Sequence, residues 1–253
     1  MLTISSPADL TGLIEPIILG YFRVQGVLLV LPAFSDRVVP QRVRIAAAMA
    51  LAPLSAELAG GPQLPSAEVG AIGTVLLRCL AELLIGGLIA APARIIAFAL
   101  HMASTAIAAT ASLSQLIGTG MEAAPHPIGQ VYHLAGMALL MAMSLPLMLL
   151  DLVAQGYAIF PAGRGVDPVQ LLPGLIGLFA TSFMLAMTMA SPFILGGLLY
   201  QMLAGIVNRV MPALPVVFIG APIIIGLALI VLAALSPSIL AIWAEAVLRA
   251  GLR

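Results

Sequence analysis

Six long apolar stretches, separated by short segments rich in proline, glycine and arginine, constrain this chain more than any other feature. They cover residues 11–32, 43–59, 69–117, 128–150, 172–207 and 215–248. About 20 apolar residues are enough for a helix to cross a bilayer. Because lipid offers no hydrogen-bond partner to an open sheet, each stretch is predicted to be helical. The sequence therefore predicts an all-α membrane protein with about six long, kinked helical segments in hairpins.

Charge is scarce in this chain and is balanced. Only 8% of the 253 residues are charged, against about a quarter in soluble domains. All ten basic residues are arginines, and ten acidic residues cancel them. A chain without net charge has no general attraction for nucleic acid. We therefore expect membrane lipid and other proteins, and no nucleic acid, as its partners.

Two of the apolar stretches are too long for one straight membrane crossing. Residues 69–117 form a run of 49 residues, which as one helix would exceed twice the thickness of a bilayer, at about 1.5 Å per residue. We expect this run to kink or fold back near Pro92 and Arg94. Residues 172–207 contain Pro192, and proline inside a helix favours a bend.

Charged side chains occur inside the apolar stretches. Arg78 and Glu82 are four residues apart, which places them on one face of a helix and predicts an intramembrane ion pair. The pair has two interpretations: a structural contact that fixes helix register, or a charged element of a pore or relay. Glu15 and Arg23 lie two turns apart in the first stretch, and we interpret them as partners at a helix interface.

The sequence contains no recognisable catalytic constellation. His101, His126 and His133 lack the spacing of metal ligands, and there is no nucleophile elbow. Cys79 is the only cysteine and lies in an apolar run. We therefore expect a protein that is not an enzyme and has no metal, cofactor or catalytic site.

The stretch "SLSQLIGTGMEAAPHPIGQVY" interrupts the apolar pattern near the middle of the chain. Its glycines allow many backbone conformations, its prolines restrict the chain, and part of it is apolar. It is either a passive connection or an element that moves. The residues in question are Ser112, Leu116, Ile117, Gly118, Gly120, Met121, Glu122, Pro125 and Pro127.

The segment "FMLAMTMASPFILGGLLYQMLAGIVNRVMPALPVVFIGAPIIIGLAL" resembles the flagellar biosynthetic protein FliR family. That family has an apolar helix, an Asn-Arg-x-x-Pro turn and then Phe-x-x-Gly-x-Pro at the start of the next helix. The matching hairpin-turn residues are Asn208, Arg209, Pro212, Phe218, Gly220 and Pro222. The stretches "FSDRVVPQRVRIAAAMAL", "AELLIGGLIAAPARI" and "IFPAG" agree in order, so the resemblance covers nearly the whole chain. It departs from the family at Ser144-Leu145-Pro146, where Asn-Gly-His is common.

The resemblance implies a subunit of the type III secretion export gate in the bacterial inner membrane, at the flagellar basal body. It implies FliP-like, FliQ-like and FlhB-like partner subunits, and unfolded export substrates. In that family, the part matching residues 1–170 resembles FliP and the part matching 171–253 forms a FliQ-like hairpin. The resemblance also implies that residues 112–127 form a plug within the pore.

Other functions remain open at this point. The homologous subunit of a virulence injectisome (SctT) would share fold and mechanism but carry different cargo. An autonomous secondary transporter would also show broken helices and buried charge, but it would work alone. An intramembrane enzyme would need a catalytic constellation.

Overall fold

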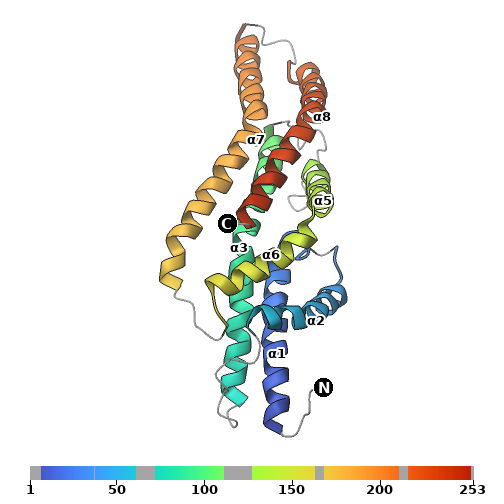
Figure 1. Cartoon of the computed structure of the whole chain (residues 1–253). Helices are drawn as coiled ribbons and strands as arrows, with labels where there is room; N and C mark the ends of the chain where they lie inside the picture. The colour runs from blue at the N-terminus through green and yellow to red at the C-terminus, as the bar shows by residue number, and fades with distance from the viewer. Residues whose placement is uncertain are drawn as a thin grey trace. The chain divides into compact units, whose positions relative to one another are not determined.

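The computed structural model describes residues 7–36, 38–60, 72–110, 127–162, 168–210 and 216–251. All regular structure in these ranges is α-helical, which confirms the predicted all-α class (Figure 1). The helices are α1 (Pro7–Val30), α2 (Gln41–Leu58), α3 (Ile72–Thr110), α5 (Pro127–Ala142), α6 (Leu145–Ile159), α7 (Pro168–Val210) and α8 (Val216–Gly251).

The fourth apolar stretch, predicted as one segment, forms two helices. Helices α5 and α6 meet at 69° across a short break. Ser144 has φ 73° and ψ 27°, the left-handed conformation, and Pro146 lies in the first turn of α6. A proline is tolerated there because the first amides of a helix have no partner inside it. The segment predicted over 128–150 is thus a bent pair of helices that extends to Ile159.

Helix α3 does not fold back as the sequence suggested. It continues through Pro92 for 39 residues. Proline removes a single hydrogen bond from the helical ladder, and the bonds on both sides of it keep the helix continuous. Helix α7 is likewise one element of 43 residues, and Figure 1 shows it changing direction partway along its length.

Three of the described helices are long and apolar enough to cross a membrane, and the bent α5–α6 pair can add a fourth. The three lie in α3, α7 and α8. Six candidate segments were expected, so the described residues hold fewer candidates than the sequence suggested. Helix α2 is shorter and more densely charged than these three, because its 18 residues include Arg42, Arg44 and Glu57.

The chain divides into two compact units. Unit 1 contains Met1–Arg94, Leu140–Ile176 and Val247–Arg253, and unit 2 contains Ile95–Leu139 and Gly177–Ala246. Helix α3 continues from the first unit into the second.

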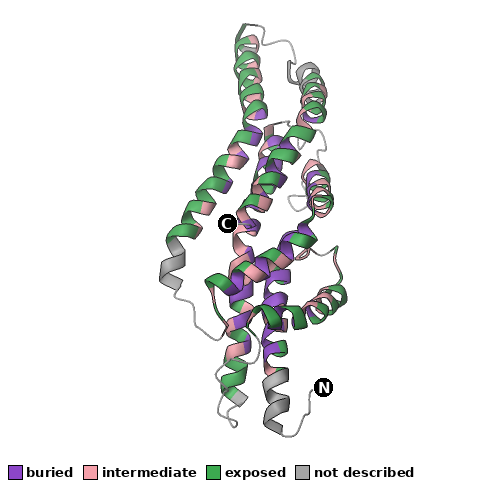
Figure 2. Ribbon diagram, in the orientation of Figure 1, coloured by how far each residue is buried: buried purple, intermediate pink, exposed green. Residues whose placement is uncertain are grey.

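In unit 1, helices α1 and α3 run side by side in the same direction (Figure 1). Buried residues line the sides on which they meet (Figure 2). Their backbones touch: a Cβ atom on Gly26 would collide with the carbonyl oxygen of Leu83, and one on Gly86 with that of Arg23. Small residues at such crossings allow helices to approach closely.

In unit 2, a buried tryptophan organises the packing. Trp243 of α8 is fully buried, and its ring lies against Gly136 of α5. Its Nε1 donates a hydrogen bond of 3.2 Å to the carbonyl oxygen of Ala97. The Oγ of Ser182 in α7 donates to the carbonyl oxygen of Ile95 at 2.7 Å. Neutral hydrogen bonds thus join α7 and α8 to the second half of α3.

Candidate functional site

A buried ion pair connects α1 and α3 inside unit 1. The Nε of Arg23 lies 2.6 Å from Oε2 of Glu82, and the two side chains are 0% and 2% exposed. Charges removed from water are costly unless they are paired and hydrogen-bonded. The contact gives each of these buried charges an oppositely charged partner.

Arg23 also contacts α6, at the end of that helix. Its Nη1 donates to the carbonyl oxygen of Phe160 at 2.9 Å, and its guanidinium lies 3.8 Å from the centre of the Tyr157 ring. A cation over an aromatic face is an attractive contact. The hydroxyl of Tyr157 in turn shares a 2.8 Å hydrogen bond with Ser55 of α2. Arg23 of α1 thus contacts α3 and α6 directly and is connected to α2 through Tyr157.

A second ion pair joins α1 and α3 nearer the protein surface. Arg78 Nη1 lies 2.8 Å from Oε1 of Glu15, and these side chains are 27% and 19% exposed. Further along α3, Arg94 donates to Ser35 Oγ at 2.9 Å. Arg94 was expected to lie near a kink or fold-back of this helix. It instead fastens the continuous helix to the segment that follows α1.

The interpretation of Glu15 and Arg23 as interface partners is confirmed by these contacts. The predicted pairing of Arg78 with Glu82 within one helix stays a prediction, while each of the two residues pairs with a residue of α1. Sequence reasoning missed Tyr157 and the Phe160 carbonyl. A tyrosine at the end of an apolar helix is a weak signal for such a contact.

The predicted plug residues lie outside the described residues, apart from Pro127, which is the first residue of α5. The hairpin residues fall partly inside helices. Asn208 and Arg209 belong to the last turn of α7, and Phe218, Gly220 and Pro222 lie in α8. Pro212 lies outside the described residues.

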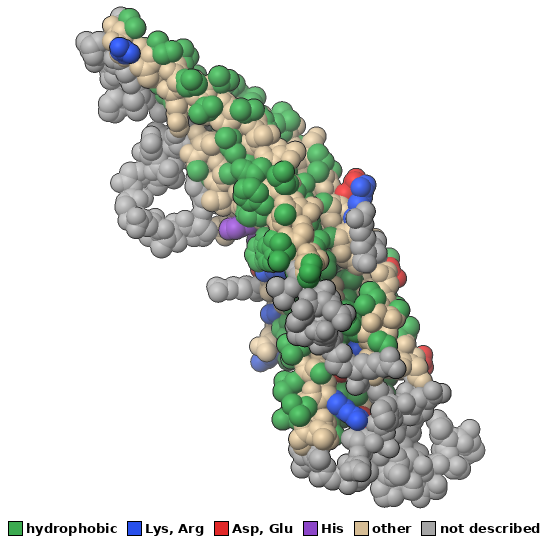
Figure 3. Space-filling model, turned by 90° about the vertical axis from the view of Figure 1, so that its left-hand side faces the viewer, with side chains coloured by type: hydrophobic (Ala, Val, Ile, Leu, Met, Phe, Trp, Pro, Cys, Tyr) green, Lys and Arg blue, Asp and Glu red, His purple; other side chains and the backbone are tan. Residues whose placement is uncertain are grey.

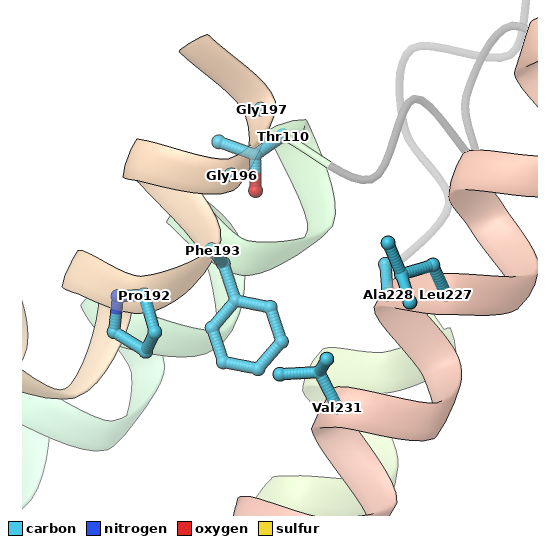
Figure 4. Close-up of a pocket in the computed structure, with 8 residues that line it drawn as sticks. All are labelled: Thr110, Pro192, Phe193, Gly196, Gly197, Leu227, Ala228 and Val231. Carbon is cyan, nitrogen blue, oxygen red and sulfur yellow. The ribbon is translucent and has the colours of Figure 1, made fainter. Parts of the chain in front are cut away.

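Unit 2 contains a small apolar cavity of about 100 Å³. Figure 4 shows the ring of Phe193 and the side chain of Val231 pointing toward one another across it. Thr110 contributes a hydroxyl, but this group already donates to the carbonyl oxygen of Ile107 at 2.8 Å. The remaining lining is Pro192, Gly196, Gly197, Leu227 and Ala228. The cavity therefore presents apolar surface. Across the described part of the chain, no three His, Cys, Asp or Glu side chains gather where they could hold a metal ion.

Much of the apolar surface of α7 is exposed in the part of the chain that the structure describes. Large hydrophobic side chains are exposed from Phe179 to Val210, a distance of about 45 Å along a helix. Figure 3, in which the side of α7 faces the viewer, shows hydrophobic side chains along this surface and few charged ones. The hydrocarbon core of a bilayer is only about 30 Å thick.

These features define an α-helical membrane protein whose first helices are fixed by buried charge and whose last long helices leave extended apolar faces uncovered. The sequence model of the family described as "Bacterial export proteins, family 1" matches residues 14–250. The chain belongs to this family. It is also 28% identical, over 232 residues and 90% of each chain, to the flagellar biosynthetic protein FliR of Caulobacter vibrioides.

Proposed function

We propose that this chain is a FliR-type, non-enzymatic subunit of the flagellar type III export gate in the bacterial inner membrane. It helps to form and close the pore through which unfolded flagellar proteins are exported. The proposal is supported by the family match over residues 14–250 and by the similarity to FliR along 90% of the chain.

The observation that carries the proposal is the length of the exposed apolar face of α7. About 45 Å of exposed apolar helix is more than a straight crossing of a hydrocarbon core of about 30 Å needs, which favours protein contacts along part of this face. Exposed apolar surface outside lipid is characteristic of protein interfaces. FliP-like and FliQ-like subunits, with an FlhB-like subunit nearby, are the partners that we propose for this face.

Unit 1 suits a role in such an assembly because its helices are already fixed before any partner binds. The buried pair Arg23–Glu82 and the contact between Gly26 and Leu83 set the register of α1 against α3. A subunit that holds its own shape loses less conformational entropy on assembly.

Residues 112–127 are the plug of the proposed gate. Deleting residues 116–124 is expected to raise the leakage of small solutes through the assembled complex, because the apolar surface of the closed state is removed. The measurement is solute efflux from proteoliposomes containing the complex, with a composition check that assembly is intact. Unchanged permeability in an intact complex would reduce this stretch to a connecting loop.

Export in cells tests the function as a whole. Deleting the gene for this chain is expected to abolish secretion of flagellin while its synthesis continues, and the intact gene should restore secretion. If flagellin secretion persists and secretion of virulence effectors stops, the chain serves an injectisome. If neither secretion changes, the export role is wrong.

A further inference from the structure

Arg23 holds the end of α6 by two contacts that are separate from its ion pair. Nη1 donates to the carbonyl oxygen of Phe160, the residue that follows α6. The guanidinium also lies over the Tyr157 ring. Carbonyl groups at the C-terminus of a helix carry the negative end of its dipole, which favours a cation at this position. Arg23 therefore fastens the last turn of α6 to α1.

The opposite end of α6 begins at a sharp turn. Ser144 adopts the left-handed conformation, which residues other than glycine adopt only at a cost, and its side chain makes no capping hydrogen bond. Pro146 has no N–H with which to extend the helix backward. The helical backbone hydrogen bonds of α5 therefore do not continue into α6. Because of this interruption, α6 can change its direction at the turn without breaking its own helical hydrogen bonds.

The position of α6 against α3 is defined by close packing. A Cβ atom on Gly156 would collide with the side chain of Ile89 in α3. Met148 and Leu152, which lie on the inward side of α6, are buried. This buried side packs α6 against the rest of unit 1.

The polar network at the end of α6 is not fully satisfied. Nη2 of Arg23 is buried and has no hydrogen-bond partner in the part of the chain that the structure describes. A buried donor without a partner costs free energy, and native structures contain few of them. The docked position of α6 is therefore less stable than a fully paired network would make it.

We propose that Arg23 is a latch for α6. When its guanidinium holds Tyr157 and the Phe160 carbonyl, α6 is docked; when these contacts open, α6 moves as one helix about the turn at Ser144. The proposal concerns a movement within this chain, and it does not rest on the proposed export function.

Hydrogen–deuterium exchange of the full chain in lipid nanodiscs tests the latch, because amide exchange reports local opening. The variant Arg23→Lys keeps a positive charge beside Glu82 but removes the planar fork that serves both contacts with α6. We expect the amides of residues 145–159 to exchange about ten to a hundred times faster, because the variant removes one charge-assisted hydrogen bond and one cation–ring interaction. The exchange rates of the amides in residues 14–30 and 41–58 should change by less than about twofold, since the packing of these two helices is retained.

Arg78→Lys is the matched control, because it alters the other arginine ion pair between α1 and α3 and should leave exchange in α6 unchanged. If Arg23→Lys does not fold, the double variant Arg23→Met/Glu82→Leu removes the latch without leaving a buried charge, and the same criterion applies. Exchange in α6 that stays at the wild-type rate overturns the proposal. So does an equal acceleration in α1, α2 and α6, which would make Arg23 a general core residue.

Discussion

Replacing Arg23 with methionine is expected to destabilise the protein by about 3–5 kcal/mol, because the buried carboxylate of Glu82 loses the guanidinium that lies 2.6 Å from it. Glu82→Leu should cost a similar amount, since it leaves the buried guanidinium without its carboxylate. Equilibrium unfolding in mixed detergent micelles measures both changes.

The double variant Arg23→Met/Glu82→Leu should recover most of this stability, because replacing a whole buried pair with apolar side chains is often nearly neutral. Arg78→Met serves as a comparison. The ion pair of Arg78 with Glu15 is partly exposed, and such pairs contribute about 1 kcal/mol or less. A double variant no more stable than either single variant would show that the cost does not come from uncompensated charge.

Gly86→Leu is the second substitution with a large expected effect. The new side chain would collide with the backbone carbonyl of Arg23, and a backbone atom cannot move away without separating α1 from α3. Overpacking costs about 1–3 kcal/mol where side chains can adjust. Here we expect a loss of about 3 kcal/mol or more, at or above the upper limit of that range, because a backbone atom is in the way. Equilibrium unfolding in mixed micelles measures this loss.

The neighbouring glycine provides a control on the same helix. A Cβ atom on Gly87 would lie 3.4 Å from a methyl group of Val30, which is ordinary contact. Gly87→Ala should therefore change stability by less than about 1 kcal/mol, the range of a tolerated packing change. Gly86→Ala should lower stability more than Gly87→Ala does. Equal losses of stability in the two variants would contradict a backbone contact between α1 and α3 at Gly86.

The helices themselves could be predicted from sequence, because long apolar runs bounded by proline and glycine leave few alternatives in a membrane. The break before α6 was missed, although Ser144 followed by Pro146 resembles the start of a helix. A kink or fold-back near Pro92 was predicted because helix length was compared with one bilayer thickness. Length alone does not show whether a helix bends or extends beyond the lipid.

The ion pairs could be predicted only in part. Spacing along the chain identifies side chains on one helical face, and for Arg78 and Glu82 it indicated a local pair. The choice of partners depends on how two helices pack, and the close approach at Gly86 that brings Arg23 beside Glu82 is not visible in spacing. The plug residues 112–126 fall outside the described residues, and their role stays a prediction.

Native mass spectrometry after co-expression with FliP-like and FliQ-like subunits tests the central claim most directly. If the exposed face of α7 is a protein interface, this chain should be recovered in a stable complex that contains both partner types. The chain expressed alone should aggregate or remain unstable in detergent. A stable, transport-competent monomer that binds neither partner would contradict the claim that this chain is a subunit of an export gate.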